Sequence, residues 1–225
     1  MNTAILIPAR AASTRFPDKP LALLNDVPMI RRVYDRCCMT GLDTFVLTDS
    51  KRIASLFPEG NVIVDYTDYA NGTERCCGAV DKLPQEYDQI INVQGDMPDV
   101  TQEMIKKIEL TLQYDSLATL WADFPDKSLT DDPNSVKLIH NCSYANWFGR
   151  GFAYGSWHLG VYGFKTHVLK LYNGLNVPPE EDIEKLEQLR WIQAGYRIAL
   201  GKVLFNGVEI NTPGDLVEWH SKNYL

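Results

Sequence analysis

The sequence predicts an α/β fold in which a mixed, mostly parallel sheet is flanked by helices. Short apolar runs alternate with segments of helical periodicity from residue 3 to about residue 122. Uninterrupted apolar runs are typical of strands covered on both faces, and their alternation with helices indicates right-handed βαβ units. Most of these runs also end in polar residues. Since ligands bind beyond the carboxyl ends of such strands, those polar ends are the expected site.

The elements of the N-terminal half follow one another with short connections. Strands are expected at 3–7, 44–50, 61–66, 89–96 and 116–122. A first helix is expected to begin at Pro28, which suits a first helical turn, and to stop at Gly41. A short helix is expected at 51–57. Two further helices are expected after the N-cap residues Thr73 and Thr101.

The pattern is looser from about residue 123. Strands are expected at 136–139 and 158–164, and one long helix at 178–195. The segment "GVEINTPGDL" is expected to be the end of a strand that leads into a helix near Pro213. No repeat or linker interrupts the chain, which predicts a single domain over 1–225 with a short excursion at 140–160.

Composition limits the classes of partner. The chain has 225 residues and a net charge of −7, so broad attraction to nucleic acid or to an anionic membrane is disfavoured. It contains no apolar stretch of the roughly 20 residues that span a bilayer. The N-terminal run is short and has no basic leader, which favours a cytoplasmic location. A polyanionic ligand would therefore need a local cluster of cations.

The loop after the first expected strand is such a cluster. It reads "PARAASTRFPDKP" and carries Arg10, Arg15 and Lys19 within ten residues. Its small residues would let backbone amides approach a ligand, and together with the cations they suit a triphosphate. It is not a P-loop, because no G-x-x-x-x-G-K-[ST] pattern is present. The alternative is an exposed basic loop with solvated surface ion pairs.

Two further polar ends add weaker signals. "QGD" at 94–96 ends an apolar strand, and Asp96 there is suited to Mg²⁺, which prefers carboxylates, water and phosphate oxygens. "NGTER" at 71–75 begins a helix and offers amides and a hydroxyl to a ligand. Taken alone, the first is also an ordinary strand-to-turn sequence and the second an ordinary helix cap.

Taken together and in order, these motifs resemble a known family. "IPARAASTRFPDKPL", "NGTER", "NVQGDMP", "PNSVK", "HLGVYGF", "EKLEQLR" and "NTPGDL" are similar to the successive motifs of the CMP-KDO synthetases, or 3-deoxy-manno-octulosonate cytidylyltransferases. Their close relatives are the CMP-sialic acid synthetases. The resemblance implies a Rossmann-like nucleotide-diphospho-sugar transferase fold with a small dimerisation excursion, and a homodimer.

The resemblance also implies a reaction. CMP would pass from CTP to a KDO-like 2-keto-3-deoxy sugar acid, with release of pyrophosphate, for surface polysaccharide or lipopolysaccharide synthesis. The reaction would use Mg²⁺. The chain would bind these small molecules and neither nucleic acid nor a membrane. Positioning and charge neutralisation at phosphorus would supply most of the acceleration.

The implied site residues fall into four groups. The catalytic residues are Arg10, Lys19 and Asp96. The nucleotide-binding residues are Pro8, Ala9, Arg10, Ser13, Arg15, Lys19, Asn71, Gly72, Thr73, Arg75 and Gln94. The sugar-acid residues are Gln94, His158, Tyr162, Glu187 and Gln188. The metal ligands are Asp96 and Asn211.

The sequence departs from the family pattern in three places. Asn211 stands where the family usually has a metal-binding aspartate, although Glu209 two residues earlier could partly substitute for it. Met97 replaces a glutamate. The segment from Arg150 to His158 is short, which leaves dimerisation and substrate identity open. A modified or aminated KDO, a sialic acid or another nonulosonate therefore remain alternatives, as does a degenerate homologue that binds nucleotide without turnover.

Overall fold

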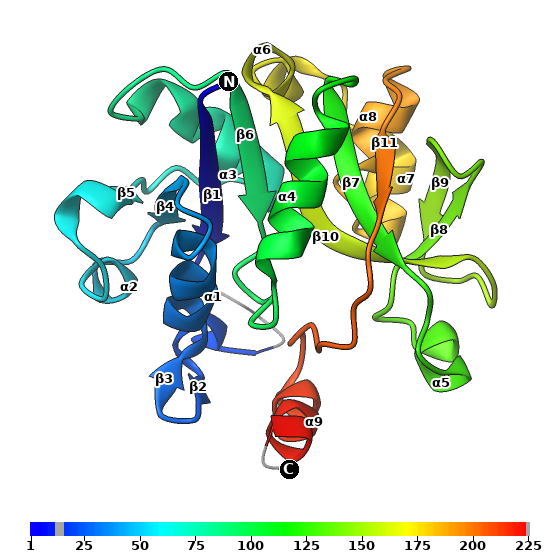
Figure 1. The fold of residues 1–225 in the computed structure, drawn as a ribbon, viewed down its shortest axis with the longest axis horizontal. Helices are drawn as coiled ribbons and strands as arrows, with labels where there is room; N and C mark the ends of the chain where they lie inside the picture. Colours follow the sequence, from blue (N-terminus) through cyan, green and yellow to red (C-terminus); the bar gives the residue numbers. More distant parts are fainter. Residues whose placement is uncertain (12–15, 224–225) are drawn as a thin grey trace.

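A computed structural model of the chain describes residues 1–11 and 16–223. The expected site residues Ser13 and Arg15 lie outside this range. Nine strands form one mixed sheet, seven of them in the order β11-β7-β10-β6-β1-β4-β5, and β8 and β9 join it beside β10. The mixed sheet flanked by helices confirms the expected fold class (Figure 1). In the described part of the chain, no helix is long and apolar enough to cross a bilayer.

The strands are close to their expected positions. The nine strands of the sheet are β1 (Thr3–Ala9), β4 (Asp43–Thr48), β5 (Val62–Val64), β6 (Gln89–Val93), β7 (Leu117–Ala122), β8 (Lys137–His140), β9 (Ala145–Gly149), β10 (Ser156–Lys165) and β11 (Ala199–Lys202). A separate two-stranded ribbon pairs β2 (Leu23–Leu24) with β3 (Val27–Pro28). The sequence did not predict β11, β9 or this ribbon.

Parallel pairing brings several strand ends to one edge. β1 runs parallel to both β4 and β6, and β11 runs parallel to β7. β10 is antiparallel to β6 and β7, and β8 pairs with its first residues. In Figure 1 the arrows of β1, β6 and β7 point to the same edge, and α9 lies beyond it. The loops after β1 and β6 therefore meet at the edge where a ligand is expected.

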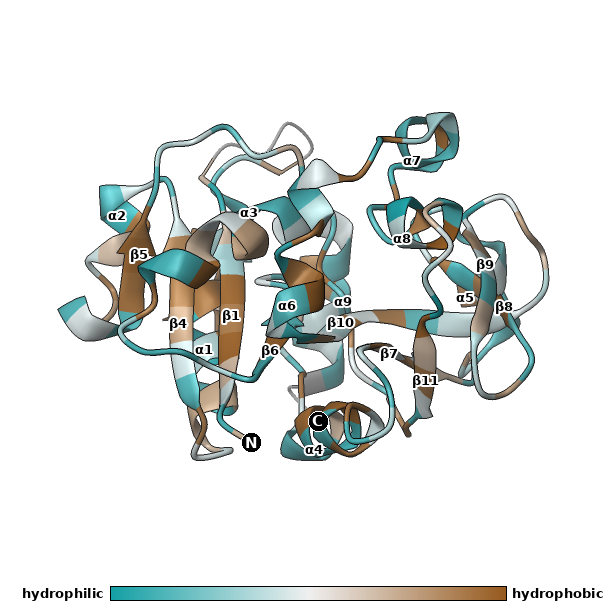
Figure 2. Cartoon of the chain, turned by 90° about the horizontal axis from the view of Figure 1, so that it is seen from above, coloured by the Kyte–Doolittle hydropathy of each residue, from teal (hydrophilic) through white to brown (hydrophobic). Residues whose placement is uncertain are grey.

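Helices cover both faces of the sheet. They are α1 (Met29–Cys38), α2 (Lys51–Ala54), α3 (Gly72–Ala79), α4 (Gln102–Thr111), α5 (Lys127–Asp131), α6 (Thr166–Leu169), α7 (Pro179–Glu184), α8 (Leu189–Gln193) and α9 (Pro213–Asn223). Buried side chains of α1 and α4 pack with Ile5 and Ile7 on one face of β1. Those of α3, α6 and α8 pack in a second cluster with Ala4 and Leu6 from the other face. Figure 2 shows the hydrophobic character of β1 that this double coverage requires.

Two helix predictions were wrong. The N-cap of α3 is Asn71, whose Oδ1 accepts a hydrogen bond of 2.8 Å from the backbone N–H of Glu74, and not Thr73. The single helix expected at 178–195 is interrupted at Lys185, which has a left-handed backbone with φ of 54°. Helix propensity favoured continuity, but the burial of Leu186 and Gln188 between the two short helices outweighs it.

The C-terminal segment also differs from expectation. The strand end expected within 207–211 is absent, since the described chain has no strand after β11. Residues 203–212 instead cross the carboxyl edge of the sheet, where the N–H of Ile210 donates to the backbone oxygen of Asp96 at 3.0 Å. The helix begins at Pro213, as predicted. This crossing brings Glu209 and Asn211 to the edge that carries Asp96.

Candidate functional site

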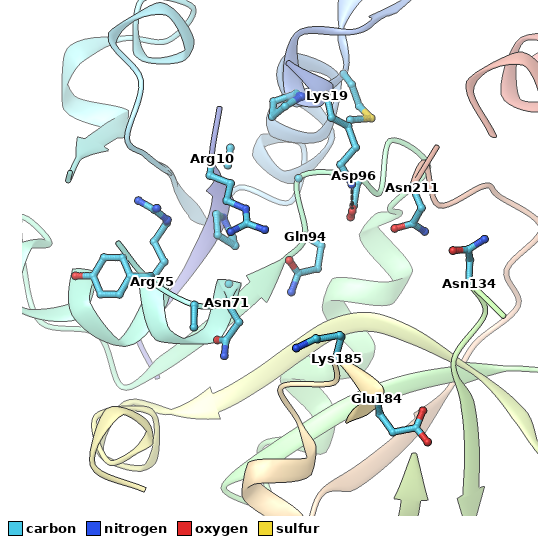
Figure 3. Close-up of a pocket in the computed structure, with 18 of the residues that line it drawn as sticks. Arg10, Lys19, Asn71, Arg75, Gln94, Asp96, Asn134, Glu184, Lys185 and Asn211 are labelled. Atoms are coloured by element: carbon cyan, nitrogen blue, oxygen red, sulfur yellow. Dashed lines mark hydrogen bonds and ion pairs between the residues drawn. The ribbon is translucent and has the colours of Figure 1, made fainter. Parts of the chain in front are cut away.

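A cavity of about 820 Å³ opens at the carboxyl edge of the sheet. The loops after β1 and β6 and the start of α3 supply its walls (Figure 3). The expected site residues that line it are Pro8, Ala9, Arg10, Lys19, Asn71, Gly72, Arg75, Gln94, Asp96 and Asn211. We call it the first cavity. Residues expected to act together from five separate segments therefore share one space.

Small residues let the segments approach closely. A Cβ on Gly95 would lie 3.0 Å from the backbone oxygen of Pro8, so a side chain there would push the loops after β1 and β6 apart. A Cβ on Gly72 would lie 3.0 Å from Oε1 of Gln94. The missing side chains of both glycines therefore leave room for close contact between neighbouring segments of the cavity wall.

Lys19 and Asp96 form the central contact of the first cavity. Nζ of Lys19 donates to Oδ2 of Asp96 at 2.6 Å, and both side chains are partly exposed (17% and 25%). Arg10 is exposed and extends toward Gln94 in Figure 3. Within the described residues Arg10 forms no ion pair with a carboxylate. Its charge is therefore available to a ligand in the cavity.

Arg75 has a different setting from Arg10. Its side chain is buried, and its guanidinium lies 3.5 Å from Asp49 and donates to the backbone oxygen of Asp65 at 3.2 Å. It also stacks over the ring of Tyr69, 5.2 Å from the ring centroid. These contacts fix the guanidinium at the wall of the cavity.

A second cavity of about 400 Å³ continues from the first. The two share Asn71, Gln94, Asp96 and Asn211 among their lining residues. The expected sugar-acid residues His158, Tyr162, Glu187 and Gln188 all line the second cavity. They come from β10 and from the turn between α7 and α8, so this turn brings two of them into the cavity.

Glu187 connects the turn to α3. Its carboxylate accepts from the N–H of Thr73 at 3.1 Å, from the Thr73 hydroxyl at 3.0 Å and from Nε2 of Gln94 at 3.2 Å. Burial raises the pKa of Glu187, and the hydrogen bonds from Thr73 oppose that rise. Thr73 is itself buried and lines neither cavity. Its observed contacts support Glu187.

His158, Tyr162 and Gln188 form a buried polar wall. Burial lowers the pKa of His158 to about 3, so its ring is neutral, and its Nε2 lies 3.0 Å from the Thr119 hydroxyl. The hydroxyl of Tyr162 donates to Oε1 of Gln188 at 3.0 Å. Nε2 of Gln188 is buried and has no hydrogen-bond partner in the described structure. This orphaned donor points to a ligand with acceptor oxygens.

The residues expected to hold a metal lie together. The side chains of Asp96 and Asn211 are neighbours in Figure 3 and line both cavities. A carboxylate and an amide oxygen are hard ligands that fit Mg²⁺. The described residues contain no group of three or more His, Cys, Asp and Glu that could hold a metal alone. A metal here would therefore take further ligands from a bound substrate or water.

Glu209 lines the second cavity near this pair. Burial, together with the negative charge of Asp96, raises the pKa of Glu209 to about 7. The nearby backbone N–H of Gly160 opposes this rise, while Oε1 of Glu209 is buried and has no hydrogen-bond partner among the described residues.

Sequence reasoning missed two cations, Arg150 and Lys185, that line both cavities. The guanidinium of Arg150 donates to backbone oxygens of Glu184 and Asn134 at 3.1 and 2.5 Å. Lys185 belongs to the motif "EKLEQLR", which could have drawn attention to it. Arg150 follows a glycine-rich aromatic segment whose hairpin pairing the sequence did not reveal.

We expect Lys137→Met to lower the free energy of unfolding by about 3 kcal/mol. The Lys137 side chain is buried, and its Nζ donates to the backbone oxygens of Asp132, Ser135 and Arg150 at 2.6, 3.0 and 2.9 Å. Methionine would leave these acceptors without a donor. Urea denaturation measures the loss, and Lys106→Met on the exposed face of α4 is the control. Equal stability of the two variants would contradict a supporting role for Lys137.

A family model and curated relatives that match this chain all describe cytidylyltransferases. Residues 4–198 match the family model described as cytidylyltransferase. The chain is 38% identical to a Shewanella amazonensis protein and 36% identical to a Shewanella oneidensis protein, and each alignment covers 96% of both chains. Both proteins are named 8-amino-3,8-dideoxy-manno-octulosonate cytidylyltransferase.

Solved structures agree with this result. One of CMP:2-keto-3-deoxy-manno-octonic acid synthetase in complex with CTP superimposes with a TM-score of 0.88 and 28% identity. The alignment covers 99% of this chain and 98% of that one. The inositol-1-phosphate CTP transferase of T. maritima has a TM-score of 0.69 at 14% identity, which shows a likeness of fold.

Proposed function

This chain belongs to the cytidylyltransferase family, and from that premise we propose that its two cavities hold the two substrates of one transfer reaction. The chain is an enzyme that transfers CMP from CTP to a KDO-like sugar acid and releases pyrophosphate. The single observation that carries the proposal is the Lys19–Asp96 contact at the junction of the cavities. Lys19 would bind phosphate and Asp96 would bind a metal. Their contact lies where the α-phosphate of CTP and the acceptor hydroxyl would have to come together.

CTP occupies the first cavity in this proposal. Arg10 and Lys19 bind the triphosphate and offset the charge that develops on the departing pyrophosphate. The close approach of Pro8, Gly72 and Gln94 supports a nucleotide lying against backbone. Arg75, held by Asp49 and Tyr69, is a rigid donor on the same wall. Ser13 and Arg15, beyond the described residues, remain predicted nucleotide-binding residues.

The sugar acid occupies the second cavity. The orphaned Nε2 of Gln188 donates to a sugar oxygen, and neutral His158 accepts or donates without adding charge. Arg150 and Lys185 balance the acceptor's carboxylate. Gln94 lies at the boundary and contacts both substrates.

The transfer needs little covalent chemistry from the protein. The anomeric hydroxyl attacks the α-phosphorus and loses its proton, the bond from that phosphorus to the bridging oxygen breaks, and pyrophosphate leaves in line. Asp96 and Asn211 would hold a Mg²⁺, which would neutralise phosphate charge when bound. The chain's own residues orient the two reactants and exclude water.

We propose further that the acceptor carries an amino group, as in 8-amino-3,8-dideoxy-manno-octulosonate. The names of the Shewanella relatives support this choice. The second cavity also favours it, since two carboxyl groups of its lining, Glu187 and Glu209, form no ion pair within the described residues. The other carboxyl groups of the lining are paired: Asp96 with Lys19, Glu181 with Arg190 and Asp182 with Lys185. Such a lining suits an acceptor with an ammonium group more than one whose only charge is negative.

A substrate panel tests the function. Purified enzyme, CTP and Mg²⁺ are incubated with KDO, its 8-amino form and a sialic acid, and pyrophosphate release is measured. We expect the fastest pyrophosphate release with the 8-amino acid. Binding of CTP without release from any acceptor would instead favour the degenerate, nucleotide-binding alternative.

We expect Lys19→Met to lower kcat/KM for CTP by about a hundredfold, because one phosphate-binding charge is lost. Steady-state pyrophosphate release measures the change. Lys106→Met removes an equal charge from the exposed face of α4, far from both cavity linings, and is expected to behave as wild type. A loss shared by both variants would show a general charge effect and remove Lys19 from the site.

The assembly and location also belong to this proposal. The hairpin of β8 and β9 overlaps the start of the 140–160 excursion, and we propose that this excursion forms the contact of a homodimer. We infer a cytoplasmic enzyme of surface polysaccharide or lipopolysaccharide synthesis. Sedimentation of the purified chain tests the dimer.

A further inference from the structure

Glu209 lines the second cavity, and the reaction above gives it no task. The crossing segment after β11 delivers it, next to the Ile210 N–H that donates to the backbone oxygen of Asp96. The backbone N–H of Gly160 lies near its carboxylate and favours the charged form. Its Oε1 is buried and has no hydrogen-bond partner in the described part of the chain.

The surroundings of Glu209 offer it no cation at contact distance. Within the described residues Glu209 forms no ion pair, and the charged groups facing it are Asp96, Arg150 and Lys19. Lys19 is committed to Asp96 at 2.6 Å. The guanidinium of Arg150 is engaged with backbone oxygens. A buried carboxylate without a partner is costly, so a cationic ligand group would be bound strongly there.

The position of Glu209 separates it from the nucleotide. Asp96 and Asn211 line both cavities, whereas Glu209 lines the second cavity and not the first. Gly160 and Met97 lie beside it in the same wall, since a Cβ on Gly160 would lie 3.9 Å from the sulfur of Met97. Met97 is buried and apolar, so it provides no competing charge. Glu209 therefore borders the space proposed for the acceptor and not the space proposed for the nucleotide.

We propose that Glu209 recognises a primary ammonium on the acceptor and so selects an aminated sugar acid over its hydroxyl counterpart. This inference rests on the proposed function, because it needs the sugar acid in the second cavity. An ammonium donates to Oε1 and supplies the missing charge, whereas a hydroxyl supplies a hydrogen bond and no charge. One charge-assisted hydrogen bond to the buried Oε1 of Glu209 would then discriminate the aminated acceptor from the hydroxyl one.

The experiment compares two acceptors in three proteins. Values of kcat/KM for 8-amino-3,8-dideoxy-manno-octulosonate and for KDO are measured with wild type, Glu209→Gln and Glu59→Gln. Glutamine keeps the shape and removes the charge, and Glu59 is an exposed glutamate far from the cavities. We expect Glu209→Gln to lower kcat/KM for the amino acceptor about 30-fold, to change that for KDO less than threefold, and Glu59→Gln to change neither.

Two further readouts separate this role from others. Calorimetric binding of the amino acceptor without CTP should weaken similarly in Glu209→Gln, which tests the contact even if turnover fails. Absence of turnover with both acceptors would overturn the proposed function, and the binding result would still decide the role of Glu209. Equal losses for the two acceptors, unchanged binding, or weaker Mn²⁺ binding by Glu209→Gln in spin-resonance titrations would each overturn the assignment.

Discussion

Asp96→Asn is expected to lower kcat by about a thousandfold and to leave the fold almost unchanged. The substitution removes the carboxylate at the junction of the two cavities, and with it the charge proposed to hold Mg²⁺ against the reacting phosphate. The Lys19–Asp96 pair is partly exposed, so its loss should cost the free energy of unfolding about 1 kcal/mol or less. Pyrophosphate release and urea denaturation measure the two effects.

A matched variant separates catalysis from charge. Asp81 is exposed and pairs with Lys170 at the surface, away from both cavities. Asp81→Asn makes the same chemical change and should retain wild-type turnover. If Asp96→Asn kept more than a tenth of the wild-type kcat, the carboxylate would not be central to the reaction.

Arg190→Met is expected to lower the free energy of unfolding by about 4 kcal/mol. Its side chain is 3% exposed, and its Nε and Nη2 donate to the two carboxylate oxygens of Glu181 at 2.8 and 2.6 Å. Nη2 also donates to Glu74 at 2.9 Å, and the guanidinium lies 4.2 Å from the ring centroid of Tyr172. Methionine would leave the buried carboxylate of Glu181 without its cation. Chemical denaturation measures the loss.

Arg190→Lys keeps the prediction testable if Arg190→Met does not fold. Lysine keeps the charge but cannot bind both oxygens of Glu181 with a planar fork, so we expect an intermediate loss of about 2 kcal/mol. The order wild type, Arg190→Lys, Arg190→Met is the expected ranking of stability. A methionine variant as stable as wild type would show that the buried ion pair contributes nothing net.

The first half of the fold could be predicted because its signals are local. The apolar run 3–7 lies within β1, and Thr101 caps α4 as expected, accepting from the N–H of Met104 at 3.3 Å. Hydrophobic periodicity and capping depend on neighbours in the sequence, so they can be read without a structure. The convergence of Arg10, Lys19 and Asp96 followed from parallel strands that end at one edge.

The turn between α7 and α8 could not be predicted in this way. Its sequence favours a continuous helix, and Lys185 has no local reason to adopt a left-handed backbone. Contacts with a distant element decide it, since Glu187 must reach Thr73, 114 positions earlier in the sequence. A distant contact also holds Asn71, the N-cap of α3, because its Nδ2 donates to Oε1 of Glu181 at 3.3 Å.

The sequence alone determined this protein's class, its cation-bearing loop and a substantial part of the residues that line the two cavities, because residue types and their order carry that information. The tertiary structure decided which of them touch: Lys19 meets Asp96, Thr73 turns away to Glu187, and Glu209 arrives beside Gly160 without a cation. Burial and partnership depend on chain segments far apart in sequence. The lowered pKa of His158, and with it the neutral ring, therefore arises only when folding buries the side chain.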